Sequence, residues 1–346
     1  MMVDKMIVNA IFILVVFFSL LELFCSRKNF FIFLIPLVAM VIFVGIRSVG
    51  GTDYDVYKLY FESIPDAIYS YGLGYFGLNY VVKLFCNDFN LLIAVSGMSA
   101  VLMQGWYFYK NSNKPTLCLM MFYAISFIWL DMVLIRQSIA AGLLLIAADF
   151  FFRRKNLLAL IFLTFATMFH EVTVVIAIAG VILYKTNSRH YIKILLVSVV
   201  SLWWIKIIVV YLNQTILHNG NIEAYLSEPP FVSGSLLIDF LFACFIYFLS
   251  TNQRTLIHEK EKKIYQVIMV LGVSVLLVSY LLPVMARLSE YIKFFYILMT
   301  VSYISRQEKI ANKVLLFVAL FIYCAVRLNV FLTHFDGGFI YSTYMV

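Results

Sequence analysis

Residues 6–25 read MIVNAIFILVVFFSLLELFC, a run of twenty residues with one acidic side chain. A helix needs about 20 mostly apolar residues to cross a bilayer. Comparable runs lie at 29–46, 89–109, 115–134, 137–152, 191–211, 235–250, 264–283, 288–304 and 314–331. With 64% hydrophobic and only 13% charged residues, the 346-residue chain has too little polar surface for a soluble particle. The sequence therefore predicts an all-α polytopic membrane protein, a bundle of about 10–12 transmembrane helices.

The positive charges give a topology, because cytoplasmic connections are enriched in Lys and Arg. The clusters are Arg27 with Lys28, Lys110 with Lys114, Arg153 to Lys155, Lys185 to Lys193, Arg254 to Lys263 and Arg306 to Lys313. All six clusters can be cytoplasmic only if the run 157–184 crosses the membrane and returns as two short helices that meet near His170. Both termini are then outside. We expect one integral membrane domain over 1–346, in which the external loops 47–88 and 212–234 contribute to the site.

Composition also excludes other classes. The net charge of +8 does not predict nucleic-acid binding, because the cations lie in short clusters between spans rather than on one face of a soluble domain. The five cysteines are scattered singly, so neither disulfides nor a zinc site are expected. The first apolar run has no small-residue cleavage pattern and is interpreted as a retained span rather than a removed signal peptide.

The first polar motif follows the second span and reads RSVGGTDYDVY over 47–57. Arg47 begins it, the paired glycines Gly50 and Gly51 allow a tight turn, and Asp53 and Asp55 follow. This DxD spacing holds divalent cations in other settings, but Asp55 can equally cap the next helix. The tyrosines of the loop, Tyr54 among them, fit an interfacial aromatic belt or a surface on which sugars stack.

Three more motifs lie at predicted outer ends of spans. Arg136 with Gln137 opens the span at 137–152, where a helix N-terminus and a fixed charge suit an anion; alternatively, Arg136 marks a cytoplasmic boundary. His170 interrupts an apolar run and is followed by Glu171, so it is either a proton acceptor or a satisfied core histidine. Glu171 could cap the next helix or orient the imidazole.

The last motif lies in the stretch PVMARLSEYIK at 283–293. Arg287 and Tyr291 are one helical turn apart there and would share a face. Glu290 and Lys293 are expected to pair with each other or to extend toward the interface. An ionised side chain at membrane depth is costly and usually faces a cavity or a partner. The four motifs therefore predict a site for an anionic lipid headgroup at one membrane face.

An Arg-x-x-Gly-x-x-Asp-Tyr-x-x-Tyr loop after an early span, a later Arg-Gln-x-Ile-Ala, a Phe-His and a late Arg-x-x-x-Tyr occur here in one order. This succession, over roughly residues 40–305, resembles the EpsG-like branch of the Wzy-type polysaccharide polymerases. The resemblance implies a GT-C-like architecture of the lipid-dependent glycosyltransferases, in the bacterial inner membrane, with its site facing the periplasm or exterior. It also implies a product such as O-antigen, capsule or exopolysaccharide.

The implied reaction transfers a glycan from undecaprenyl pyrophosphate to an acceptor hydroxyl of another lipid-linked repeat unit. The resemblance then suggests pyrophosphate binding by Arg47, Arg136 and Arg287, with His170 or its rival Asp53 as general base. Tyr54, Gln137 and Tyr291 would position sugar or phosphate. No cofactor and no metal are expected. The implied partners are the lipid-linked donor and acceptor, the bilayer and a chain-length regulator protein, without nucleic acid.

Other classes also use arginines or a histidine in a helical bundle. A flippase or transporter of lipid-linked oligosaccharides would line a cavity with arginines, but no repeat of half the chain length is visible in the sequence. An O-antigen ligase or a membrane acyltransferase is a further alternative, and the acyltransferase has less need of three outward arginines.

Overall fold

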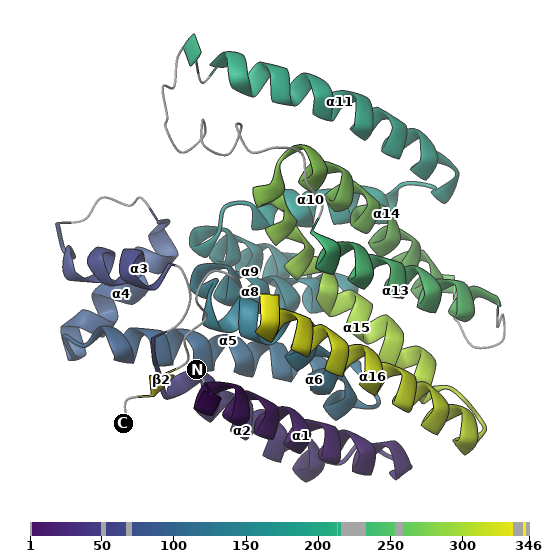
Figure 1. Ribbon diagram of the computed structural model, residues 1–346. Coiled ribbons are helices and arrows are strands. Elements are labelled where there is room, and N and C mark those ends of the chain that lie inside the picture. The colour runs from purple at the N-terminus through teal and green to yellow at the C-terminus, as the bar shows by residue number, and fades with distance from the viewer. Residues whose placement is uncertain are drawn as a thin grey trace. The chain divides into compact units, whose positions relative to one another are not determined.

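The computed structural model describes residues 2–49, 53–66, 71–212, 214–215, 233–252, 259–334 and 342–343, and almost all of them are helical (Figure 1). The first elements are α1 (Met2–Phe24), α2 (Phe30–Gly45), β1 (Arg47–Val49), α3 (Tyr54–Glu62), α4 (Leu73–Phe85), α5 (Phe89–Asn111), α6 (Pro115–Phe122), η1 (Tyr123–Phe127), α7 (Ile128–Met132), α8 (Ile135–Phe152) and α9 (Asn156–Phe169). The remainder are α10 (Thr173–Lys185), η2 (Ser188–His190), α11 (Tyr191–Leu212), α13 (Gly234–Asn252), α14 (Glu259–Leu281), η4 (Pro283–Leu288), α15 (Ser289–Ser305), α16 (Ile310–His334) and β2 (Ser342–Thr343).

Seven helical stretches among the described residues are long and apolar enough to cross a bilayer. They are Lys5–Phe24, Phe89–Asn111, Pro115–Met132, Ile135–Phe152, Gly234–Thr251, Glu259–Tyr280 and Ile310–Thr333. Shorter apolar helices are α2, α9 and α10. The prediction of an all-α polytopic membrane protein is therefore confirmed.

The chain divides into two compact units, which are described separately. Unit 1 comprises residues 1–175 and 304–346. Within it α1 packs against α2, α6 and α16, and α5 packs against α2, α6 and α8. Helix α8 then packs along α9, and α4 also contacts α9. These helices bring the segments after α2, before α8 and after α9 into one body.

Unit 2 comprises residues 176–303. Its central helix is α14, which contacts α11, α13 and η4. Gly272 of α14 allows a close approach, because a Cβ there would lie 2.9 Å from the ring of Phe240 and closer still to the hydroxyl of Tyr296. The single integral membrane domain over 1–346 stays a prediction.

The predicted break at His170 is confirmed. Helix α9 ends at Phe169 and α10 begins at Thr173, so the run 157–184 forms two short helices. His170 leaves the helical conformation, with φ −148° and ψ 107°, while its amide still donates to the carbonyl of Ala166 at 3.0 Å. The histidine is therefore the C-terminal cap of α9.

The segment 47–88, which the sequence predicts to be external, contains two helices that the apolar pattern does not reveal, α3 and α4. Lys83 of α4 joins them. Its Nζ donates to the carbonyls of Phe61 (3.0 Å), Glu62 (3.0 Å) and Ile64 (2.5 Å) at the end of α3. A lysine at a helix C-terminus satisfies carbonyls that have no partner within the helix. The pair is called the α3–α4 hairpin below.

The two short strands β1 and β2 pair antiparallel, with Arg47 opposite Thr343. This pairing joins the segment after α2 to a segment near the C-terminus. Both segments were expected outside, and the pairing places them at the same end of unit 1.

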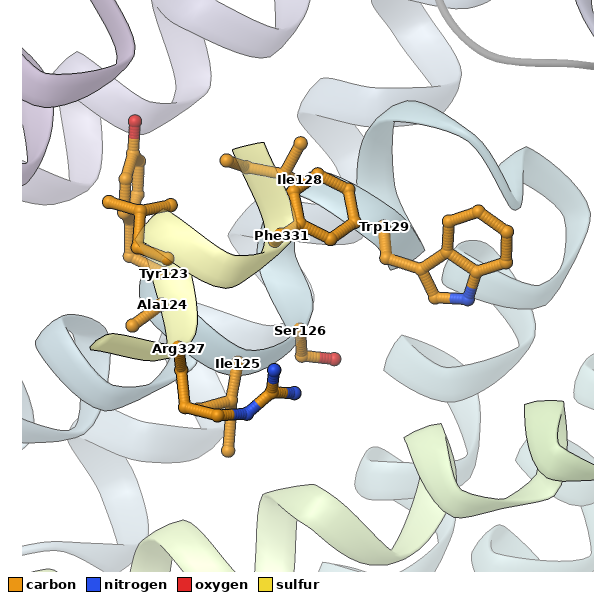
Figure 2. A pocket seen from close by; sticks show the side chains of 9 residues that line it. Tyr123, Ala124, Ile125, Ser126, Ile128, Trp129, Arg327 and Phe331 are labelled. Atoms are coloured by element: carbon orange, nitrogen blue, oxygen red, sulfur yellow. The ribbon is translucent and has the colours of Figure 1, made fainter. Parts of the chain in front are cut away.

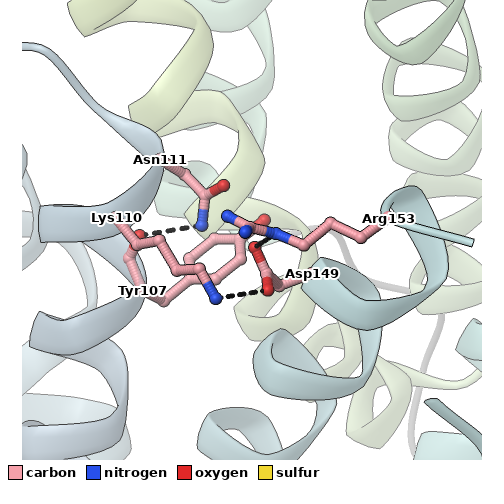
Figure 3. Close-up of polar contacts among 5 residues, drawn as sticks. All are labelled: Tyr107, Lys110, Asn111, Asp149 and Arg153. Carbon is pink, nitrogen blue, oxygen red and sulfur yellow. Dashed lines mark hydrogen bonds and ion pairs between the residues drawn. The ribbon is translucent and has the colours of Figure 1, made fainter. Parts of the chain in front are cut away.

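An ion pair with a buried carboxylate joins α5 and α8 near the positive clusters Lys110 with Lys114 and Arg153 to Lys155 (Figure 3). Asp149 of α8 is 3% exposed, and its carboxylate lies 2.7 Å from Nζ of Lys110 and 3.1 Å from Nε of Arg153. A buried carboxylate requires such partners.

Another buried carboxylate, Glu22, holds the start of α6. It is 0% exposed and accepts the amides of Thr116 (2.8 Å) and Leu117 (3.2 Å). The first amides of a helix lack intrahelical partners, and the helix dipole favours an anion there. The carboxylate of α1 therefore caps α6.

Substitution Glu22→Ala removes this cap and leaves two buried amides without a partner. We expect the free energy of unfolding to fall by about 1–3 kcal/mol. Thermal unfolding of the purified protein in detergent measures the change. The control is Glu308→Ala at an exposed acidic residue, and equal stability of the two variants would contradict the capping role.

Candidate functional site

Arg47 lies in β1, directly after α2, and its side chain is 1% exposed. Its Nη1 donates to the main-chain carbonyl of Asp131 at 2.7 Å. Asp131 is the penultimate residue of α7 and is itself 0% exposed. The positive charge of Arg47 therefore lies beneath the surface, beside the short connection that leads into α8.

Arg136 lies in the first turn of α8 and is partly exposed. Its Nη1 donates to the carbonyl of Tyr71 at 3.1 Å, and its guanidinium carbon lies 4.8 Å from the ring centre of Tyr71 and 5.9 Å from that of Tyr57. The quadrupole of an aromatic ring attracts a cation over its face. Its Nε is buried without a hydrogen-bond partner among the described residues, so the guanidinium retains donor capacity.

The rings around Arg136 form a cluster on the α3–α4 hairpin. Tyr60 lies 4.7 Å from Tyr71 and 5.9 Å from Tyr75, measured between ring centres, and Tyr57 lies 5.5 Å from Tyr75. Burial raises the pKa of Tyr60 and the pKa of Tyr75 above the ordinary value of a phenol. Arg136 itself is held by contacts with the rings of Tyr57 and Tyr71 and by the carbonyl of Tyr71.

The same hairpin contacts the end of α9. Gly72 adopts φ +87°, and a Cβ at this position would lie 2.5 Å from the main-chain oxygen of Met168. A Cβ at Gly74 would lie 2.8 Å from the ring of Phe169. His170, half-buried, is the next residue. Through Tyr71 and Gly72 the hairpin thus contacts both Arg136 and the helix end that carries His170.

The remaining residues of the first motif lie at the start of α3. Asp53 precedes the helix, and its carbonyl accepts the amide of Tyr57 at 3.0 Å. Asp55 is exposed in the first turn, where a carboxylate complements the helix dipole. The hydroxyl of Tyr54 donates to Oδ1 of Asn90 at 3.5 Å, and burial raises its pKa. Within the described residues no three His, Cys, Asp or Glu side chains lie close enough to hold a metal, and the absence of a metal stays a prediction.

Gln137 follows Arg136 and is 3% exposed. Gly50 and Gly51, and the part of loop 212–234 with His218, Asn219, Glu223, Pro229 and Pro230, lie outside the described residues.

The fourth motif belongs to unit 2. Arg287 lies in the 3₁₀ segment η4, whereas Tyr291 lies in α15 and is 1% exposed. The two therefore do not occupy one α-helix as expected, because Pro283 opens a separate 3₁₀ turn before α15 begins at Ser289.

The expected pairing of Lys293 with Glu290 is confirmed. Their side chains lie 2.6 Å apart, and the carboxylate of Asp239 on α13 lies 3.5 Å from the same Nζ. All three side chains are buried. Asp239 was not singled out in the sequence, although an acidic residue within an apolar span is a sufficient signal.

A second residue missed in the sequence is Arg327, which is 6% exposed in α16. It lines a cavity of about 20 Å³ together with Ser126 of the π-helix η1 and Trp129 of α7 (Figure 2). A cavity of this size holds roughly one water molecule and no sugar. An arginine within an apolar span could have identified it.

Fold and site together define a polytopic membrane protein that gathers cationic and aromatic side chains at one end of its first unit. The sequence profile of the EpsG family matches residues 30–344, and the chain belongs to this family. Membership supports a role like that of a polysaccharide polymerase, in the manner of a glycosyltransferase. No curated protein and no solved structure matches the chain.

Gly72→Ala tests the contact between the hairpin and α9. The new methyl group would meet a main-chain oxygen in a backbone conformation that L-residues rarely adopt, so we expect a loss of more than about 1 kcal/mol in the stability of the docked hairpin. Hydrogen exchange of the α4 amides measures it. Gly77→Ala is the matched control, because nothing lies within 4 Å of a Cβ there. Equal exchange in both variants would show that the hairpin does not depend on this contact.

Proposed function

We propose that the protein is a polysaccharide polymerase that joins lipid-linked repeat units at the outer leaflet of the bacterial inner membrane. In one displacement, a hydroxyl oxygen of the acceptor repeat unit attacks the anomeric carbon of the donor glycan. The bond between that carbon and the diphosphate oxygen breaks, and undecaprenyl pyrophosphate leaves with the electron pair. The configuration at the carbon is inverted.

One observation carries this proposal: the α3–α4 hairpin contacts both Arg136 and the end of α9 that bears His170. Tyr71 accepts a hydrogen bond from Arg136, and Gly72, the next residue, packs on Met168. A cation for the leaving group and a base for the attacking group are the two requirements of the reaction.

The arginines are proposed to bind the leaving diphosphate. A guanidinium binds phosphate oxygens with two parallel hydrogen bonds and keeps its proton. Arg136 is partly exposed and retains the donor capacity of its Nε. Arg47 adds its charge from the buried position next to Asp131, and Arg287 is the corresponding cation of unit 2.

His170 accepts the proton of the attacking hydroxyl, with Asp53 as its rival. Histidine suits this role because its unperturbed pKa is the one closest to working pH among the side chains. Tyr54, Gln137 and Tyr291 are proposed to position sugar or phosphate. The donor and acceptor are both undecaprenyl-pyrophosphate-linked oligosaccharides, and a chain-length regulator protein is a further proposed partner.

Arg136→Ala and His170→Ala should each lower chain elongation by about 100-fold, since each removes a group that acts only as charge or proton moves. Arg136→Lys should lower chain elongation by about tenfold or more, because an ammonium lacks the planar donor geometry of a guanidinium. Gel separation of surface glycans from cells that carry each variant measures chain length. Single repeat units on the final acceptor, without long chains, are the expected product.

Lys155→Ala, at an exposed lysine of the turn between α8 and α9, is the control and should leave the ladder unchanged. Loss of even the single units from the cell surface would identify a defect in transport across the membrane and contradict a polymerase. Normal ladders in both site variants would contradict it as well.

A further inference from the structure

Asp131 joins three segments of unit 1 through two of its oxygens. Its main-chain oxygen accepts Nη1 of Arg47 at 2.7 Å. Its carboxylate Oδ1 accepts Nε2 of Gln104 on α5 at 2.9 Å and, in a short hydrogen bond, the hydroxyl of Ser138 on α8. The residue therefore connects β1, α5 and α8 at the end of α7.

Every member of this cluster is buried. Gln104 and Asp131 are 0% exposed, and Arg47 and Ser138 are 1% exposed. A carboxylate in an apolar span is costly unless it has partners, and residues of this kind usually have a specific role. The hydrogen bonds to Oδ1 of Asp131 join α5 to α8 and fix the rotation of α8 about its axis, because Ser138 lies on that helix.

The cluster also sets the spacing of two arginines. Arg47 is bonded to residue 131 itself, and Arg136 lies two residues before Ser138 in the first turn of the helix that Asp131 holds. The connection between α7 and α8 is short: the amides of Val133 and Leu134 both donate to the carbonyl of Trp129, each at 3.2 Å. A shift of Asp131 would therefore displace one arginine relative to the other.

We propose that Asp131 is a positioning residue that holds Arg47 and Arg136 in register for the diphosphate of the donor. This inference rests on the proposed function. It adds a carboxylate that touches no substrate but fixes the two cations that would stabilise the leaving group. Displacement of a binding group by about 1 Å can cost as much as 100-fold in rate.

Asp149 offers a matched control on the same helix. It is also a buried carboxylate with two partners, Lys110 and Arg153, but it lies near the opposite end of α8 (Figure 3). Its loss should weaken the bundle without altering the spacing of Arg47 and Arg136. If Asp131 only stabilised the fold, its substitution and that of Asp149 would have the same phenotype.

The kinetic test uses the purified full-length protein and a defined lipid-linked repeat unit. Asp131→Ala should raise the KM for the donor by about tenfold or more. Asp131→Asn keeps an acceptor oxygen for Gln104 and Ser138 and should remain within about twofold of the native KM. Asp149→Ala should reduce the yield or thermal stability but leave the KM unchanged. An unchanged KM in Asp131→Ala, or the same increase in Asp131→Asn or in Asp149→Ala, would overturn the proposal.

A second readout does not depend on polymerisation. Phenylglyoxal labels accessible guanidinium groups, and mass spectrometry of the peptides gives the rate at Arg47. We expect Arg47 to be protected in the native protein, in Asp131→Asn and in Asp149→Ala. In Asp131→Ala it should be labelled at least about fivefold faster, because loss of the side-chain bonds to Gln104 and Ser138 lets the main chain at residue 131, whose oxygen holds Arg47, shift. If polymerisation is absent while this labelling pattern holds, the proposed function fails, but the role of Asp131 in holding Arg47 stands. Protection of Arg47 in Asp131→Ala would overturn that role.

If Asp131→Ala does not yield monodisperse protein, Ser138→Ala carries the test. It removes only the hydroxyl through which Asp131 holds α8. The donor KM should then rise about threefold, because one hydrogen bond is lost, while Arg47 remains protected. An unchanged KM in this variant would overturn the proposal.

Discussion

The structure depends on one constraint, the lack of water at membrane depth, where each buried charge and each free backbone group must find a partner within the protein. Glu22 meets it by accepting the first amides of α6, and Asp149 by pairing with Lys110 and Arg153. Lys293 meets it between two carboxylates of unit 2. These contacts join helices that are apolar on most sides and would otherwise pack with little specificity.

The candidate site is built on the same constraint. Arg47 is buried and bound to Asp131, whereas Arg136 is partly exposed and held by the ring and carbonyl of Tyr71. One arginine is thus an internal charge and the other is accessible to a ligand. The hairpin that holds Arg136 also packs on the end of α9, so a segment between α2 and α5 determines how the proposed cation and base are placed.

Much of the fold could be predicted from the sequence. The apolar runs predicted helices, and seven helical stretches among the described residues are long and apolar enough to span a membrane. The positive clusters required the run 157–184 to break, and it does so at His170, between α9 and α10. The order of the polar motifs gave the family. The hairpin helices α3 and α4 were not predicted, because their tyrosines resemble an interfacial belt when the loop is considered alone.

The side-chain partners of the site could not be predicted for a physical reason. A helix that is apolar all round has no face that fixes its rotation, so periodicity does not show which residue meets Arg47 or Arg136. The bond from Arg47 to Asp131 and that from Arg136 to Tyr71 span 84 and 65 residues. Arg327, in contrast, is a charge in an apolar run that the sequence analysis missed, and its place in the cavity beside η1 comes only from the structure.

The most direct test of the account is incubation of the purified protein, in lipid vesicles, with a defined undecaprenyl-pyrophosphate-linked repeat unit, followed by gel separation of the products. We predict a ladder whose steps are one repeat unit and which disappears with Arg136→Ala. Unchanged substrate with native protein, or a ladder that persists without the guanidinium of Arg136, would contradict it.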